Sequence, residues 1–363
     1  MIFIKSIFRD ISVRLKSIFN REHSDNFKIG KQTNVNQLNV YKGLTTVEAV
    51  DLINKVVDQK LIGFKSEAEL TFGKRVDEFK QVLIPKLGQL SEQELDKLRD
   101  PDTILALKEA SEISGRKTNH ELRQLLANLV IRRIKNNEPG EEELKNLVYN
   151  EAISTIAKLT PDQLKIITLC YLLRYTSNSA VTSIMSLNVY LNTSIKPFLE
   201  FRNTISQFQH IEYAGCGSIN TFGISLSGVI KNNYFALFQK PIEPDNVQAW
   251  GIETDLLTKI TSQREDKLYF VGRNKVDFKN NIKQHTFDEQ IIKSILGRYE
   301  EHALSEQEVK DIVSNTDIGR QLINVWEESE LMKMTLTTVG IVIGATNYEQ
   351  ILGDQVNIDK WIN

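Results

Sequence analysis

The chain has 363 residues, and its 45 lysines and arginines against 47 aspartates and glutamates give a formal net charge of −2. Apolar residues make up 41% and charged residues 25% of the chain, which is ordinary for globular proteins and argues against collagen, coiled-coil rods and disordered chains. The near-neutral balance excludes binding of polyanions through overall charge. Because only 18 glycines and 7 prolines occur, few positions favour tight turns, and the composition predicts helices rather than a β-sandwich or barrel.

The cysteines, histidines and apolar segments exclude several kinds of site. Cys170 and Cys216 are too few for a disulfide framework, which fits a reducing cytosol. The five histidines are scattered, and the chain holds no zinc signature and no glycine motif for phosphate. We therefore expect no metal and no cofactor. Residues 334–348 are too short to span a bilayer, and charges interrupt the apolar N-terminus, unlike a secretory signal. The sequence predicts a cytoplasmic protein.

Residues 1–21 have the pattern of a basic amphipathic helix. At about 100° per residue, the large apolar side chains fall on one stripe, formed by Ile4, Ile7, Phe8, Ile11, Leu15, Ile18 and Phe19. Basic side chains flank this stripe, namely Lys5, Arg9 and Lys16 on one side and Arg14 and Arg21 on the other. These five basic side chains and one acidic side chain, Asp10, give the segment a charge of +4. The asparagine-rich residues 22–44 predict a polar linker.

Three interpretations of the N-terminal segment stay open. It could be an ordinary first helix packed on its own domain. It could also lie peripherally in a membrane interface, with its apolar stripe down and its cations toward anionic headgroups. Finally, it could dock in the groove of a protein partner or pair with copies of itself. The linker favours the last two interpretations, because it would let the helix move independently.

Residues 45–240 predict a helical domain whose helix starts are marked by local signals. Capping boxes of the T-x-x-E or S-x-x-E type begin at Thr45 and Ser91. Pro85 is expected to end a helix that starts at Ser66. Asp100 followed by proline opens a further helix. Later helices are predicted from Asn119 and over 141–157, 161–175, 180–191 and 225–238.

Two short β patches interrupt the predicted helices. Residues 210–224 combine glycines with β-prone residues and predict a strand–turn–strand. Residues 332–338 predict a second patch, followed by a helix that ends at Gly353. The order helix, strand, helix is similar to the wing end of a winged helix. Acidic residues precede this strand, so contact with nucleic acid is not expected.

The prolines at 241 and 244 mark a domain boundary. We therefore expect a C-terminal helical domain with a short β element over 241–363. Its helices are predicted near 252–262, 286–302, 305–314 and 317–330.

Two short segments could be interpreted as functional sites, but a structural role is the simpler interpretation of each. The basic run at 131–135 ends a predicted helix, where cations complement the helix dipole. Cys216 stands between two glycines, with His210 nearby in sequence. A reactive thiol needs a base in contact with it, and a cysteine flanked by glycines is more simply a turn residue. No catalytic residue is assigned.

Several segments carry a family resemblance, namely GLTTVEAVDLI at 43–53, DPD at 100–102, KLTPDQLKIITLCYLLRYT at 158–176, EYAGCGSI at 212–219, LTTVGIVIGATN at 336–347 and the final DKWIN. Together they resemble a family of uncharacterised, mostly helical bacterial proteins known only by locus-type names, over roughly residues 30–363. The resemblance implies no activity and no catalytic residues. It suggests an association with phage defence or mobile elements, which no residue of the sequence itself supports.

The sequence thus predicts a mainly α, multi-helix, cytoplasmic protein with two small β patches. We expect a non-enzymatic interaction or regulatory protein that binds a protein partner or associates with itself. The alternative is a membrane-associated effector, with phage defence as its setting, that acts through residues 1–21. A second alternative is an enzyme with an unrecognised site.

Overall fold

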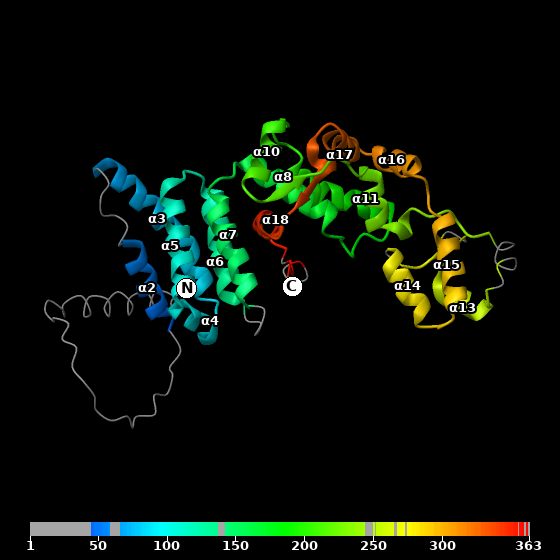
Figure 1. The fold of residues 1–363 in the computed structure, drawn as a ribbon, viewed down its shortest axis with the longest axis horizontal. Coiled ribbons are helices and arrows are strands. Elements are labelled where there is room, and N and C mark those ends of the chain that lie inside the picture. Colours follow the sequence, from blue (N-terminus) through cyan, green and yellow to red (C-terminus); the bar gives the residue numbers. More distant parts are fainter. Residues whose placement is uncertain are drawn as a thin grey trace, which may run out of the picture. The chain divides into compact units, whose positions relative to one another are not determined.

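The computed structural model describes residues 45–58, 66–136, 142–243, 250, 252–264, 267–272, 274–354, 356–358 and 361. The chain divides into two compact units, one before Arg116 and one from Arg116 onward. The boundary expected near Pro241 falls inside the second unit. The described chain is mainly α, as the sequence predicts, with two two-stranded antiparallel sheets (Figure 1). No helix among these residues is both long enough and apolar enough to cross a membrane.

The first unit consists of helices with local caps. The Glu48 carboxylate accepts a hydrogen bond from Thr45 N at 2.9 Å, and Thr45 Oγ1 accepts one from Glu48 N at 3.3 Å. This confirms the predicted capping box. The helices of this unit are α2 (Thr46–Asp58), α3 (Ser66–Leu87), α4 (Glu92–Asp96), which a 3₁₀ turn (Lys97–Arg99) follows, and α5 (Pro101–Arg116).

Pro85 does not end its helix, and this prediction was wrong. The proline lies within α3, which continues to Leu87. A proline removes one backbone N–H from the helix. The helix loses that one bond and ends two residues later, at Leu87.

Two helices that are apolar almost all round form the core of the second unit. α8 (Pro161–Arg174) is buried over most of its length, and α18 (Thr338–Leu352) is buried from Gly340 to Tyr348. They pack side by side (Figure 1), and α6 (His120–Lys135) and α7 (Glu142–Ile156) also contact α18. Helices without a polar face belong in the interior, so α8 and α18 form the centre around which this unit is built.

The remaining helical elements of the second unit are α9 (Ile184–Tyr190), continued by a π turn (Leu191–Ile195) and a 3₁₀ turn (Lys196–Phe198); α10 (Ile205–Tyr213); α11 (Leu226–Asn233), followed by a 3₁₀ turn (Phe235–Leu237); α13 (Thr254–Ile260); α14 (Lys275–Lys283); α15 (Glu289–Glu301); α16 (Glu306–Ser314); and α17 (Asp317–Glu327), followed by a 3₁₀ turn (Glu330–Lys333). The sequence predicted no helix over α14.

The two predicted β patches form one sheet. β1 (Gly217–Ile219) pairs antiparallel with β4 (Met334–Leu336), so that Gly217 faces Leu336. The predicted strand–turn–strand over 210–224 was wrong, because residues up to Tyr213 belong to α10 and the partner of β1 lies far along the chain. The residues after β4 enter α18 directly, so no hairpin forms where a wing would stand.

A second sheet and a small separate core were not predicted. β2 (Thr261–Arg264) pairs antiparallel with β3 (Lys267–Phe270). Beside this sheet, the rings of Phe235, Tyr299 and Phe278 form a continuous stack, with centroids 4.0 Å and 4.1 Å apart. Apolar side chains of α13, α14 and α15 join these rings in a core of their own.

Candidate interaction surface

The site predicted from the N-terminal segment lies outside the described residues. This covers the whole apolar stripe and the basic residues that flank it within residues 1–21. The other candidates of the sequence analysis do lie in the described chain.

Within the described part of the chain, no base is paired with Cys216. The Cys216 side chain is fully buried, and burial raises the pKa of its thiol to about 12, so the nucleophilic thiolate is absent at neutral pH. His210 is exposed, and its Nδ1 lies 3.0 Å from Gln163 Nε2. Among the described residues, no three metal-binding side chains come together.

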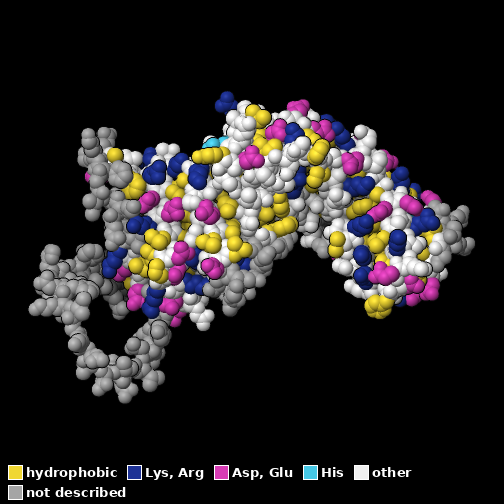
Figure 2. All heavy atoms as spheres, viewed as in Figure 1, with side chains coloured by type: hydrophobic (Ala, Val, Ile, Leu, Met, Phe, Trp, Pro, Cys, Tyr) yellow, Lys and Arg dark blue, Asp and Glu magenta, His cyan; other side chains and the backbone are white. Residues whose placement is uncertain are grey.

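The basic run at 131–135 has structural partners. Arg132 forms an ion pair with Glu349 of α18. Arg133 is buried, and its Nε donates a hydrogen bond to Asn150 Oδ1 at 3.3 Å. Figure 2 shows positive and negative side chains interspersed over the face in view. The run therefore contributes to packing of the helices.

An exposed aromatic side chain marks a surface that the sequence analysis missed. Phe222 lies in the segment that follows β1, residues 220–224, which we call the 220–224 loop. Its side chain is 86% exposed, and that of Ile224 is 50% exposed. Tyr213, at the end of the helix that leads into β1, is 85% exposed. These residues show no helical or alternating period, so the pattern analysis had no signal with which to find them.

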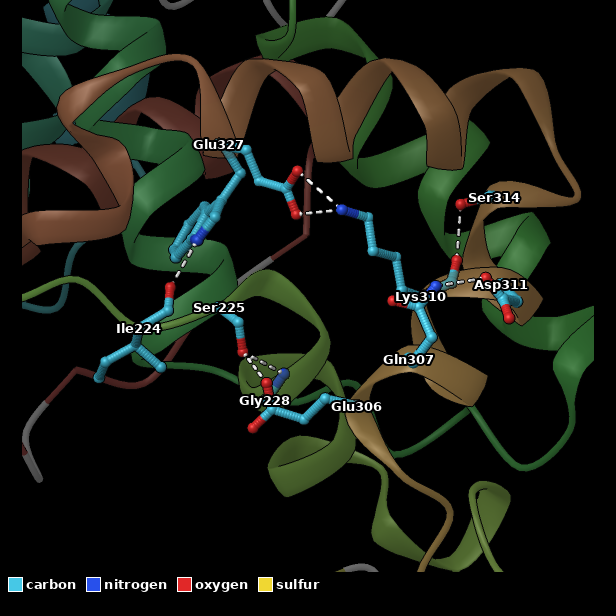
Figure 3. A network of polar contacts seen from close by, with 10 residues as sticks. Ile224, Ser225, Gly228, Glu306, Gln307, Lys310, Asp311, Ser314 and Glu327 are labelled. Carbon is cyan, nitrogen blue, oxygen red and sulfur yellow. Dashed lines mark hydrogen bonds and ion pairs between the residues drawn. The ribbon is translucent and has the colours of Figure 1, made fainter.

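Hydrogen bonds fix both ends of the 220–224 loop. Asn220 donates from its backbone N and from its side-chain Nδ2 to Lys333 O, both at 2.9 Å. At the other end, Ile224 N donates to Met332 O at 2.8 Å. The Trp326 indole Nε1 donates to Ile224 O, also at 2.8 Å (Figure 3). The three residues between these anchors therefore have little freedom to move.

Gly223 allows the loop to approach the chain beneath it. A Cβ atom at this position would lie 2.5 Å from Met332 Cε and 3.1 Å from Met332 O. A side chain at this position would require the Met332 side chain to move and would crowd the Met332 carbonyl oxygen. The glycine therefore sets how closely the 220–224 loop lies against the segment that precedes β4.

The end of α8 holds the segment to which the loop is bound. Arg174 donates to Met332 O at 2.6 Å, and its guanidinium lies 5.1 Å from the centroid of the Trp326 ring. The Tyr175 hydroxyl accepts a hydrogen bond from Leu336 N at 2.7 Å. These contacts connect the loop to the central helix of the unit.

Polar contacts also connect the helices that follow the loop (Figure 3). Ser225 caps α11 by accepting a hydrogen bond from Gly228 N at 3.1 Å, and its hydroxyl donates to Glu306 of α16. Lys310 of α16 contacts Glu327 of α17 at 2.7 Å. These contacts connect α11 to α16 and α16 to α17, the helices that adjoin the 220–224 loop.

Comparison with known proteins gives a family and no activity. A model of an uncharacterised protein family matches residues 43–362. The chain belongs to this family. No curated protein and no solved structure matches the chain. The family match begins at Gly43, after the amphipathic segment and at the end of the predicted linker.

The geometry of the 220–224 loop suits recognition of another molecule. An exposed aromatic side chain offers a large apolar contact area with few rotatable bonds. Because the loop is already ordered, binding through Phe222 would lose little conformational entropy. Ordered aromatic anchors of this kind are typical of the residues that dominate protein–protein affinity.

Proposed function

We propose that this protein is a non-enzymatic, cytoplasmic interaction protein of bacteria that binds a protein partner through the 220–224 loop. The observation that supports it is the exposed Phe222 side chain in a segment hydrogen-bonded at both ends. A single exposed aromatic ring is ordinary on a protein surface, but a ring held on an ordered loop offers a partner a large apolar contact at little entropic cost. A partner surface that covers the Phe222 ring would explain why the loop holds it in this position.

The chemistry around the loop favours a protein surface over nucleic acid. Lys333 lies in the segment to which the 220–224 loop is hydrogen-bonded. Its ammonium group is already within 3.1 Å of the Glu330 carboxylate. Nucleic-acid binding needs unpaired cations that can displace counterions from phosphates. An apolar anchor among paired charges is instead the arrangement of a protein interface, with an apolar centre and a polar rim.

Site-specific photocrosslinking tests this proposal directly. A photoreactive phenylalanine analogue at Phe222 should give a defined crosslinked product in living cells. Phe287 provides a matched control, because it is 90% exposed and lies just before α15. The mass of the product distinguishes a second copy of this chain from another protein.

Affinity measurements complete the test once the crosslinked partner is purified. Phe222→Ala should weaken binding by about tenfold or more, as expected for an aromatic anchor, whereas Phe287→Ala should leave the affinity unchanged. Equal crosslinking at both positions, or an unchanged affinity of the Phe222→Ala variant, would contradict the proposal.

A second candidate function is association with a membrane surface through residues 1–21, and the +4 amphipathic pattern of that segment supports it. Ile11→Asp should abolish binding to liposomes while the unfolding temperature stays the same, because a charge on the apolar face opposes insertion. Replacing Lys5, Arg9, Arg14 and Lys16 by serine should weaken binding to anionic vesicles only, and high salt should have the same effect. Co-sedimentation with vesicles measures both.

The opposite result identifies an ordinary packed helix. If Ile11→Asp clearly lowers the unfolding temperature and the original chain does not sediment with vesicles, the segment packs on its own domain, because the substitution then buries a charge. The membrane proposal is dropped in that case.

A further inference from the structure

A cavity of about 300 Å³ opens in the second unit, where the core built on α8 and α18 adjoins the smaller core around Phe278. Its walls come from the segment that follows α8, the end of α11 with the 3₁₀ turn after it, β2, and the residues that follow β3 (Figure 1). The volume is at the lower end of the range for small-molecule sites, and such sites are frequent where two cores meet.

The lining of this cavity carries no charged side chain among the described residues. A charged ligand would lose part of its hydration there without gaining a counter-charge, and such a transfer is unfavourable. The cavity therefore favours an uncharged molecule.

Four hydroxyl groups line the cavity, those of Ser177, Ser179, Thr182 and Ser262. In the described chain none of them is hydrogen-bonded to another residue, since Thr182 donates only from its backbone N. Each hydroxyl can both donate and accept, so the set matches a ligand whose own hydroxyl or amide groups do the same. Such a ligand replaces the hydrogen bonds that accessible hydroxyls make with water.

Apolar side chains form the floor of the cavity. Val181 and Tyr234 are each 7% exposed, whereas Ser177, Ser179 and Thr182 are exposed residues and lie toward the opening. An apolar floor below a few polar groups is the usual lining of a small-molecule site. It suits a ring that has a nonpolar face and polar groups at its edge.

Hydrogen bonds hold the walls of the cavity in place. Asn178 N donates to the Tyr234 hydroxyl at 3.0 Å, which joins the segment after α8 to the end of α11. Asn233 Nδ2 donates to Leu173 O of α8 at 2.8 Å. Because the walls are fixed before a ligand arrives, binding costs little ordering of the protein.

Gly272 brings backbone without a side chain to the wall of the cavity. Its φ of 127° is one that L side chains rarely adopt, and a Cβ atom would lie 2.9 Å from Phe278 Cβ. Glycine serves where backbone must come close to a ligand. A molecule in the cavity therefore meets the main chain directly at this point.

We propose that this cavity binds an uncharged small molecule with hydroxyl or amide groups on a ring, the class to which monosaccharides and nucleosides belong. Its polar groups hydrogen-bond to the hydroxyls of the lining, and the nonpolar face of its ring lies on Val181 and Tyr234. The site goes beyond the protein–protein interaction proposed above, and none of its lining residues belongs to the 220–224 loop.

Calorimetric titration and thermal unfolding of the full chain test the site with matched pairs of probes. The neutral probes are glucose, N-acetylglucosamine and adenosine, and each is compared with its monophosphate ester. At least one neutral probe should bind and raise the unfolding temperature. Its phosphate ester should bind about tenfold more weakly or worse, because the phosphate finds no counter-charge in the cavity.

Two variants of the lining place the bound probe in this cavity. Ser262→Ala removes one hydroxyl and should weaken binding by about two- to tenfold, the range for a hydrogen bond between uncharged groups. Ser179→Trp puts a large side chain at the opening and should abolish binding. Ser294 is the matched control, because it is exposed on α15 and does not line the cavity.

Ser294→Ala and Ser294→Trp should leave binding of the neutral probe unchanged. The unfolding temperature without a ligand should be the same in Ser179→Trp and in Ser294→Trp, because both positions are exposed. Absence of binding by all three neutral probes overturns the proposal. So does equal or tighter binding of the phosphate esters, or binding that neither Ser262→Ala nor Ser179→Trp weakens.

Discussion

Cys170 and Cys216 both lie in the interior of the second unit. Burial raises the pKa of each thiol from an ordinary 9.0 to about 12. The sequence alone left a reactive Cys216 open as an interpretation. The residue type could not decide this, because reactivity depends on whether neighbouring groups favour the thiolate. Here the surroundings of both residues favour the neutral thiol.

The shifted thiols predict a loss of stability in alkaline solution. Unfolded chains release these protons near pH 9, whereas the folded chain holds them to about pH 12. Between these values the unfolded state binds fewer protons, so the free energy of unfolding falls as pH rises. Each thiol should contribute up to about 1.4 kcal/mol per pH unit. Urea unfolding between pH 8.5 and 10 measures the slope, which should be shallower in Cys170→Ala and in Cys216→Ala. An identical slope in all three proteins contradicts the assignment.

Among the secondary-structure elements, the sequence predicted what depends on near neighbours. The capping boxes that open α2 at Thr45 and α4 at Ser91 form as expected, because a cap joins residues three positions apart. Pairing of β1 with β4 joins Gly217 to Leu336. No local pattern encodes a contact across that separation, so the sequence could locate the two patches but could not join them. The position of Phe222 depends on the same pairing and was missed for the same reason.

Packing of α18 against β1 depends on Gly340. A Cβ atom there would lie 1.9 Å from the Cys216 carbonyl oxygen, so the helix start and the strand must separate to admit a side chain. Gly340→Ala should lower the free energy of unfolding by about 1–3 kcal/mol. Gly297 of α15 is the matched control, because a Cβ atom there meets nothing within 4 Å. Gly297→Ala should raise it by about 0.5–1 kcal/mol. Urea unfolding of both variants checks the difference, and a loss of equal size in the two would contradict it.

Within the second unit as a whole, a polar contact connects its first helix to α18. Arg132 of α6 pairs with Glu349 of α18, with only 17% and 18% of the two side chains exposed. Arg132 also donates to Val356 O at 3.1 Å, and Glu349 Oε1 accepts from Val356 N at 2.6 Å. The pair therefore joins three segments from opposite ends of the unit.

Breaking this pair should cost more than breaking a surface pair. Glu349→Gln keeps the size of the side chain and leaves Arg132 without its counter-charge, so we expect the free energy of unfolding to fall by about 2–3 kcal/mol. Asp255→Asn removes the partner of Lys259 in an exposed pair and should have no measurable effect. Chemical unfolding of both variants measures the contrast, and equal losses would show that the buried position of Glu349 does not matter.

The position of α18 in the chain has a consequence for synthesis on the ribosome. The helix follows in sequence every element that it contacts in the core, including α6, α7 and α8. Until residues 338–352 emerge, the apolar face of α8 that packs against α18 stays exposed, and chaperones and proteases recognise such surfaces. A chain whose translation stops before Thr338 therefore keeps this apolar face exposed, which is the mark by which unfinished copies are recognised.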